Sequence, residues 1–216
     1  MPFREIDMSR DPRKAHFDHF RHMPDPHVGL TVDVDVTDFV GICKARGWAF
    51  YPAFIRVAAQ AANAVPELRR RIRGDIVVEY DRCDTSHIEL LDNGTYCYCT
   101  LRHDPAQSWE DYMAYAAARR EAARAGASIE EEDDVESLYF ISTIPWLRYR
   151  GFYQPNYGPD SSNPAITWGK YEPDYLGRLM MPLTILAHHA LVDGLKIAAF
   201  YENMDLCLKH ISTLNT

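Results

Sequence analysis

The feature that most limits how this chain can fold is the long apolar run LMMPLTILAHH at residues 179–189. A run of this kind predicts a strand, and the residues after it predict a tight turn. An amphipathic helix then begins near Asp193. Its apolar stripe consists of Ile197, Phe200, Tyr201, Met204 and Leu208. Two histidines and an aspartate therefore lie between a strand and a helix, where the apolar pattern predicts burial.

The rest of the chain mixes helices and strands without strict alternation. Helices are predicted at 13–20, 37–46, 52–72 and 109–125, with Thr37 and Ser108 as caps of the second and fourth. Strands are predicted at 28–36, 75–80, 87–91, 95–101, 137–146 and 165–171. This order indicates the α+β class with a mixed, mostly antiparallel sheet. The largest composition shift runs from Ala116 to Asp134, from an Ala/Arg-rich segment into EEEDD, and indicates a helix followed by a solvated acidic loop. It is too short to mark a domain boundary, so we expect a single domain spanning 1–216.

Charge and composition exclude several classes of partner. The net charge is −8 and no basic stripe stands out, so nucleic acid is not expected to bind. The cluster RRRIR at 69–73 is predicted to end a helix as a solvated face. No window has the roughly 18 apolar residues of a membrane span. Five cysteines without a paired C-x-x-C spacing indicate reduced thiols and a cytoplasmic protein.

Three interpretations of His188, His189 and Asp193 compete. In the first, Asp193 caps the helix and the histidines are packed in the core. In the second, His189 and Asp193 bind a metal, but Asp193 begins the helix and no third ligand is evident, so we expect no metal. In the third, an uncharged imidazole at the mouth of an apolar pocket takes a proton from a hydroxyl. The third requires a cation beside Asp193, because a lone buried carboxylate is costly.

Five segments together resemble the chloramphenicol acetyltransferase family, within the wider group of CoA-dependent acyltransferases. HHALVDG, at 188–194, resembles the H-H-x-x-x-D-G signature of that family. The other four follow the family's order across nearly the whole chain. They are DPRKAHFDHF, the Phe-Tyr-Pro helix FYPAFIRVAAQAANAVPELRRRI, FISTIPW and ITWGKY. The resemblance implies a two-layer sandwich, in which helices pack on the mixed sheet.

The resemblance also implies an acetyl-CoA-dependent O-acetyltransferase and assigns its catalytic residues. His189 matches the general base, and Asp193 matches an aspartate that pairs with Arg13 to fix the turn. Ser142 matches the serine that stabilises the oxyanion of the tetrahedral intermediate. Thr167 matches a threonine that assists through an ordered water. His188 is expected to be a packing neighbour.

Binding residues follow from the same resemblance. Those expected near the nucleotide end of acetyl-CoA are Tyr51, Lys170 and Tyr171. Those expected to form an apolar, partly aromatic acceptor pocket are Phe20, Pro26, Val28, Tyr98 and Phe152. The chain departs from the family at Ala49, where a basic residue is common, and at Gln154, where an apolar residue is expected. The loop after Trp146 also carries two arginines.

The family is a homotrimer, so the resemblance implies active sites between subunits. One chain presents the histidine and the next presents most of the acceptor pocket. Acetylation of chloramphenicol is the first hypothesis, and transfer to a different hydroxyl or amine acceptor is the alternative. A third hypothesis is a binding protein that keeps the fold without turnover.

Overall fold

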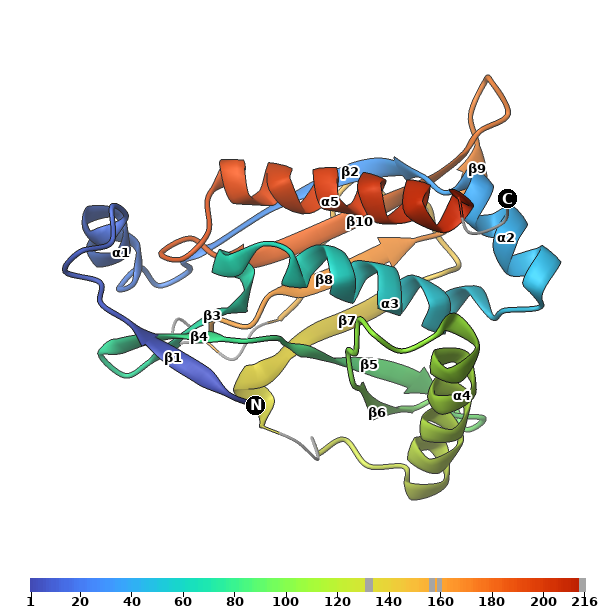
Figure 1. Cartoon of the computed structure of the whole chain (residues 1–216), viewed down its shortest axis with the longest axis horizontal. Coiled ribbons are helices and arrows are strands. Elements are labelled where there is room, and N and C mark those ends of the chain that lie inside the picture. Colours follow the sequence, from blue (N-terminus) through green and yellow to red (C-terminus); the bar gives the residue numbers. More distant parts are fainter. Residues whose placement is uncertain (131–133, 156–157, 159–160, 214–216) are drawn as a thin grey trace.

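The computed structural model of the chain describes residues 1–130, 134–155, 158 and 161–213. Its helices are α1 (Lys14–Phe20), α2 (Thr37–Arg46), α3 (Phe50–Asn63), α4 (Trp109–Gly126) and α5 (Gly194–Thr213), with short 3₁₀ turns at Pro66–Arg69 and Val135–Ser137. Its strands are β1 (Phe3–Ile6), β2 (His27–Asp35), β3 (Arg70–Arg73), β4 (Ile76–Tyr80), β5 (Asp84–Leu90), β6 (Tyr96–Leu101), β7 (Leu138–Ile144), β8 (Ala165–Gly169), β9 (Glu172–Pro173) and β10 (Leu179–His188). Figure 1 shows their arrangement.

The described strands form one large and one small sheet. The large sheet has the order β2-β10-β8-β7-β5-β6, with β9 added beside β10, and β1-β4-β3 form the small sheet. Strand β7 runs parallel to β5 and β8, whereas the other pairs are antiparallel. The predicted α+β class with a mixed, mostly antiparallel sheet is therefore confirmed. The apolar run at 179–188 is the long strand β10, buried along most of its length.

The helices cover one face of the large sheet. Helices α3 and α5 pack against each other across this face, and α4 packs on β5 and β6 (Figure 1). Alternate residues of β10, such as Leu183 and Ile185, point into the core under these helices. The opposite face carries Thr184, and the loop after β7 covers it through Tyr149, whose hydroxyl contacts Thr184. The sheet therefore separates an apolar helix layer from a more polar face.

The segment 64–73 differs from the predicted helix. Helix α3 begins at Phe50 and ends at Asn63, and the cluster RRRIR enters strand β3. Pro66 opens a 3₁₀ turn, since its ring cannot continue an α-helix. Arg71 is fully buried, and its guanidinium donates to the carbonyl oxygens of Leu68, Arg70, Glu136 and Leu138. The charge is tolerated because these oxygens replace water, so the prediction of a solvated face was wrong for Arg71.

Two predicted helix caps had different outcomes. Ser108 caps α4 as predicted, because its side chain accepts a hydrogen bond from the Asp111 amide. The Thr37 prediction was wrong, since its hydroxyl donates to Asp35 and accepts from the Leu179 amide instead. Of the acidic segment expected to be a loop, residues 131–133 lie outside the described part. Among the described helices, none combines the length and the apolar character that a membrane span needs.

Candidate active site

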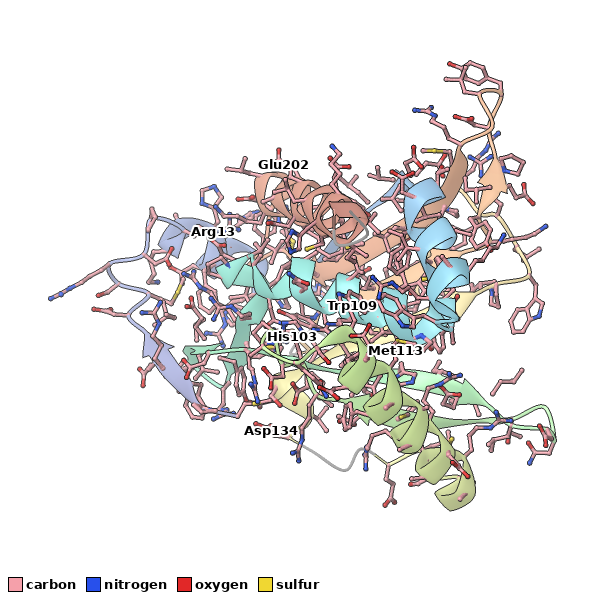
Figure 2. The ribbon with its side chains drawn as sticks, turned by 45° about the vertical axis from the view of Figure 1, so that its right-hand side comes forward. Arg13, His103, Trp109, Met113, Asp134 and Glu202 are labelled. Atoms are coloured by element: carbon pink, nitrogen blue, oxygen red, sulfur yellow. The ribbon has the colours of Figure 1, made fainter. Side chains whose placement is uncertain are left out.

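Arg13 holds the turn between β10 and α5. Its Nη1 forms an ion pair with Asp193, and its Nη2 donates to the carbonyl oxygen of His189 at 3.0 Å. The side chains of Arg13 and Asp193 are 13% and 34% exposed, so solvent only partly screens the pair. Arg13 lies at the end of the molecule that carries α1, away from α4 with Trp109 and Met113 (Figure 2). One guanidinium thus fixes both ends of the turn.

Asp193 also caps helix α5. Its Oδ1 accepts a hydrogen bond from the Lys196 amide at 3.2 Å. Partial burial raises the pKa of Asp193, but the Lys196 hydrogen bond and the Arg13 charge outweigh it, so the pKa is lowered overall. Asp193 is therefore an ionised helix cap with a cationic partner, which combines the first and third interpretations of the sequence.

His189 is held by contacts that leave one ring nitrogen for chemistry. Its amide donates to the Pro26 carbonyl at 2.7 Å, and its Nδ1 lies 2.9 Å from the Val192 carbonyl. Because a carbonyl oxygen can only accept, Nδ1 must carry the hydrogen, and in the neutral ring the lone pair is then on Nε2. The Phe20 ring stacks on the imidazole, with centroids 4.0 Å apart. The half-buried imidazole therefore has a defined tautomer and orientation.

His188 lies in different surroundings. Its side chain is buried, its Nδ1 accepts from the Ala190 amide at 3.2 Å, and its ring packs edge-on against His27. These contacts suit the packing neighbour that the resemblance implied. Asp193 is poorly placed to ligate a metal ion, because its carboxylate forms an ion pair with Arg13. Within the described part of the chain, no group of three or more His, Cys, Asp or Glu side chains could hold a metal ion.

A second group of predicted residues surrounds a cavity on the polar face of the sheet. Ser142 lines this cavity of about 390 Å³ together with Tyr98, Phe152 and Gln154. Thr167 is the neighbour of Ser142 on the adjacent strand but is only 2% exposed. Its hydroxyl donates to Oε1 of Gln154 at 3.0 Å. Gln154, rather than Thr167, therefore presents polar atoms to this cavity.

The His189 turn and the Ser142 cavity are far apart in one chain. Ser142 pairs with Thr167, and Thr167 pairs with Thr184, so the three share one row across the sheet. His189 lies five positions beyond Thr184 on β10 and two strands from β7. Strand spacings put the two residues roughly 15–20 Å apart. Groups that act on one bond need contacts of about 3 Å, so Ser142 and His189 of the same chain cannot act together.

The predicted acceptor residues divide in the same way. Phe20 and Pro26 contact His189, and Val28 packs against the core beside the end of β10. Tyr98 and Phe152 instead line the Ser142 cavity. Within one chain, the five side chains do not form one pocket.

The third group lines a larger cavity at the carboxyl ends of β5, β7 and β8. Tyr51, Lys170 and Tyr171 all border this space of about 790 Å³, together with the aromatic rings of Phe50, Trp146 and Trp168. The Tyr51 hydroxyl donates to the Ile88 carbonyl at 3.0 Å, and burial raises the pKa of Tyr51. Ile88 and Tyr96 border both cavities, so the two spaces are neighbours.

Two arginines on α4 line the larger cavity and were missed from the sequence. Arg120 is bound to the buried Glu89 through two nitrogens, one of them at 3.1 Å, so its charge is neutralised. Arg124 contacts only the fully exposed Asp92 among described residues, at 3.2 Å, so its charge is largely uncompensated. Their four-residue spacing on a predicted helix placed them on one face. That spacing was the available signal, but it did not show which cavity they border.

The sequence and the structure are both similar to known acyltransferases. The profile of the family described as chloramphenicol acetyltransferase matches residues 1–205. A chloramphenicol acetyltransferase of Klebsiella sp is 28% identical over 203 residues, covering 92% of this chain and 90% of the relative. That of Clostridium perfringens is 27% identical over 208 residues, covering 94% and 97%.

Solved structures extend the similarity to the fold. A structure of a chloramphenicol acetyltransferase matches with a TM-score of 0.83 and 25% identity, covering 96% of this chain and all of that one. A probable dihydrolipoamide acetyltransferase of Listeria monocytogenes matches with a TM-score of 0.70 and 19% identity, covering 100% of this chain and 96% of that one. The latter likeness concerns the fold alone.

Proposed function

The chain belongs to the chloramphenicol acetyltransferase family, and from this premise we propose that it moves the acetyl group of acetyl-CoA to a hydroxyl of chloramphenicol. Inactivation of the antibiotic is the result. The observation that carries the proposal is the state of His189. Its Nδ1 donates a hydrogen bond to the Val192 carbonyl oxygen, so Nε2 is the nitrogen that takes a proton. The Arg13–Asp193 pair keeps this ring aimed by holding the turn.

The transfer proceeds by general base catalysis. Nε2 of His189 takes the proton of the acceptor hydroxyl while the hydroxyl oxygen forms a bond to the thioester carbonyl carbon. The Ser142 hydroxyl keeps its proton and donates a hydrogen bond to the oxyanion that develops on the carbonyl oxygen, a contribution of typically about 10²–10³ in rate. The protonated His189 then gives its proton to the sulfur as the carbon–sulfur bond breaks. The products are the acetyl ester and the free thiol of CoA.

The larger cavity suits the co-substrate. The nucleotide end of acetyl-CoA carries phosphates and an adenine ring, which require positive charge and flat apolar surface. Arg124 supplies charge, as does Lys170, whose ion pair with Glu172 at 3.0 Å is exposed and easily exchanged. Tyr51 and Tyr171 belong to the aromatic wall. We propose Arg124 as the phosphate-binding residue that compensates for Ala49, the position where the family often has a basic residue. The neighbouring Ser142 cavity then receives the acceptor.

We propose that the functional unit is a homotrimer. The separation of His189 and Ser142 within one chain supports an oligomer, because a site that uses both needs a second copy, and the number three follows from the resemblance to the family. The histidine turn of one chain, with Phe20, would close over the cavity of the next chain, with Tyr98 and Phe152. Strand β2 supports the same view, since Leu30 and Val32 are exposed apolar residues on an edge strand.

The remaining proposals concern organisation and location. We propose that residues 1–216 act as one domain, which the match over residues 1–205 supports. We also propose a cytoplasmic location, because all five cysteines are free thiols in the structure. Acetyl-CoA, a small acceptor and further copies of the chain are the proposed partners. Nucleic acid is not among the proposed partners, because a net charge of −8 disfavours binding to phosphates.

The alternative is the same chemistry on a different hydroxyl or amine acceptor. Gln154 favours it, because this amide lines the proposed acceptor cavity at a position expected to be apolar. The test is an acceptor screen with purified protein and acetyl-CoA, in which thiol release reports transfer and His189→Ala is the control. Turnover of chloramphenicol that His189→Ala abolishes supports the first proposal. Turnover of other acceptors alone supports the alternative, and binding without any turnover would contradict both.

A further inference from the structure

The direction in which the Arg13 side chain points depends on the backbone that carries it. Two of its guanidinium nitrogens bind Asp193 and the carbonyl oxygen of His189. The third, Nε, is buried and has no hydrogen-bond partner among the residues that the structure describes. Polar contacts therefore hold this side chain only at its far end. Whatever fixes the Arg13 backbone also determines where the guanidinium meets the His189 turn.

Asp11 holds this backbone through one carboxylate oxygen. Its Oδ1 accepts a hydrogen bond from the Arg13 amide at 2.8 Å, which forms a side-chain turn directly before α1. The carbonyl oxygen of Asp11 also accepts from the Lys14 amide at 3.0 Å. The Asp11 side chain is 10% exposed, so water competes little for the Oδ1 bond. The start of α1 thus has a geometry that Asp11 imposes.

The other carboxylate oxygen of Asp11 ties this segment to the small sheet, which lies at the same end of the molecule as α1 (Figure 1). Oδ2 accepts from Nη1 of Arg70 at 3.0 Å, and Nε of Arg70 donates to Glu79 at 3.1 Å. Glu79 also accepts from Arg4 at 2.8 Å. Arg4, Glu79 and Arg70 are direct partners across β1, β4 and β3. One row of the small sheet therefore anchors Asp11.

Burial holds this row in place. The side chains of Glu79 and Arg70 are 4% and 14% exposed. Burial raises the pKa of Glu79, but the hydrogen bonds from Arg70 and Arg4 outweigh it, so the pKa is lowered overall. The planar Arg70 guanidinium thus has an ionised partner on one side and presents its remaining nitrogens to Asp11.

We propose that Asp11 is a positioning residue for the general base. It joins the Arg13 backbone to the row of Arg70 and Glu79, and it thereby directs the guanidinium that holds the His189 turn. Asp11 acts through Arg13, because its side chain bonds to the Arg13 amide and to Arg70. The kinetic part of the test rests on the proposed acetyl transfer, whereas the spectroscopic part does not.

Asp11→Asn tests the proposal because an asparagine has one oxygen in place of two. It can accept from the Arg13 amide or from Arg70, but not from both. A misplacement of about 1 Å can cost about 10²-fold, and for a smaller shift we expect kcat to fall by about 3- to 10-fold, with KM for acetyl-CoA changed by less than about twofold. Activity is measured well below the unfolding midpoint of each variant, so that all chains are folded.

Asp7→Asn is the matched control. Asp7 forms the same kind of turn four residues earlier, where its Oδ1 accepts from the Ser9 amide at 3.0 Å. Its side chain is exposed and pairs with Arg10. The substitution removes the same charge without touching Arg13 or Arg70, so kcat should equal that of the natural chain.

NMR of isotope-labelled histidine side chains gives a measurement that does not need turnover. The Nδ1 hydrogen of His189, bonded to the Val192 carbonyl oxygen, is assigned by its loss in His189→Ala. Its exchange with solvent should become at least about twofold faster in Asp11→Asn, because the turn opens more often, and should stay unchanged in Asp7→Asn.

Combined variants distinguish positioning from a merely structural role. Asp193→Asn already displaces the guanidinium, so adding Asp11→Asn to it should lower kcat by less than about twofold. Arg70→Lys reaches the same contact from the other side, because one ammonium cannot bind Asp11 and Glu79 as a planar guanidinium does. It should lower kcat in the same direction, and it decides the question if Asp11→Asn does not fold.

The outcomes separate this inference from the proposed function. Unchanged kcat and unchanged exchange in the Asp11 and Arg70 variants would overturn it. An effect that Asp7→Asn reproduces, or that persists in full beside Asp193→Asn, would overturn it as well. If the His189 hydrogen exchanges faster in Asp11→Asn and the natural chain transfers no acetyl group, Asp11 positions the ring as proposed and acetyl transfer is what fails.

Discussion

Replacing Asp193 with asparagine is expected to separate the ion pair from the helix cap. Asparagine caps helices as well as aspartate does, so the hydrogen bond from the Lys196 amide remains possible. The charge opposite Arg13 is lost, and the Arg13 side chain, 13% exposed, keeps an uncompensated charge. Breaking a buried pair costs about 3–5 kcal/mol and an exposed one about 0–1, so about 1–3 kcal/mol is expected for this partly exposed pair.

The effect on catalysis follows from the same contact. Arg13 also donates to the carbonyl oxygen of His189, so a displaced guanidinium displaces the imidazole. A misplacement of about 1 Å can cost about 10²-fold, and we expect kcat of Asp193→Asn to fall by about 10- to 100-fold. KM for acetyl-CoA should change less than kcat, because the residues proposed to bind its nucleotide end, Lys170 and Tyr171, are not part of this turn.

The assay combines urea unfolding at fixed protein concentration with steady-state kinetics. Asp193→Ala is the matched variant, because it loses the cap as well and should be less stable by about another 1 kcal/mol. Unchanged stability and unchanged kcat in Asp193→Asn would refute the reasoning. Lower stability with full kcat would show that the pair supports the fold without aiming His189.

The pH dependence of stability has a definite sign. The pKa of Asp193 is lowered below its usual 3.8 in the folded chain, so the unfolded chain binds the proton more readily. The stabilisation is therefore fully present above the unfolded value and is lost as pH falls through the folded value. Between pH 5 and 8 the difference between the natural chain and Asp193→Asn should stay constant, and it should shrink in acid below pH of about 4.

Further predictions concern the base, the co-substrate and the loop. His189→Ala should remove turnover while calorimetry shows that chloramphenicol still binds, and full activity would contradict the base assignment. Arg124→Ala should raise KM for acetyl-CoA several-fold with kcat nearly unchanged, and the effect should shrink at high salt because the contact is exposed; an unaltered KM would exclude a phosphate contact. Gly169→Ala should lower the unfolding midpoint, since a Cβ there would lie 2.7 Å from the Leu147 carbonyl oxygen, and an unshifted midpoint would count against that close approach.

Hydrophobic periodicity correctly predicted the strands and helices that bury one face in the core. The apolar run of β10 and the stripe of α5 have their expected places, because each meets the core with a regular face. Periodicity failed at 64–73, where Pro66 ends the helical region and Arg71 is buried in a strand. A cluster of charged residues in the sequence predicts side chains exposed to solvent. Only the folded structure shows that four backbone carbonyl oxygens accept hydrogen bonds from the Arg71 guanidinium.

The site was predictable where it depends on neighbours in sequence. His189 and Asp193 share one turn, and the need for a cation beside Asp193 followed from the cost of a lone carboxylate. The resemblance supplied Arg13 as that cation, and the structure places it there. The bond between Thr167 and Gln154 could not be predicted, because a long loop joins them and its path is set by tertiary packing. For the same reason, Arg124 was not among the residues predicted to bind the co-substrate.

Mixing two inactive variants tests the central claim most directly. The claim is that His189 of one chain acts on a substrate held beside Ser142 of another. Co-expressed His189→Ala and Ser142→Ala chains should assemble sites in which both residues are natural, at up to about a quarter of all sites for equal random mixing in a closed ring. Acetyl transfer should then return to about a quarter of the natural rate, far above either variant alone. Mixed oligomers no more active than the separate variants would show that the two residues do not meet across an interface.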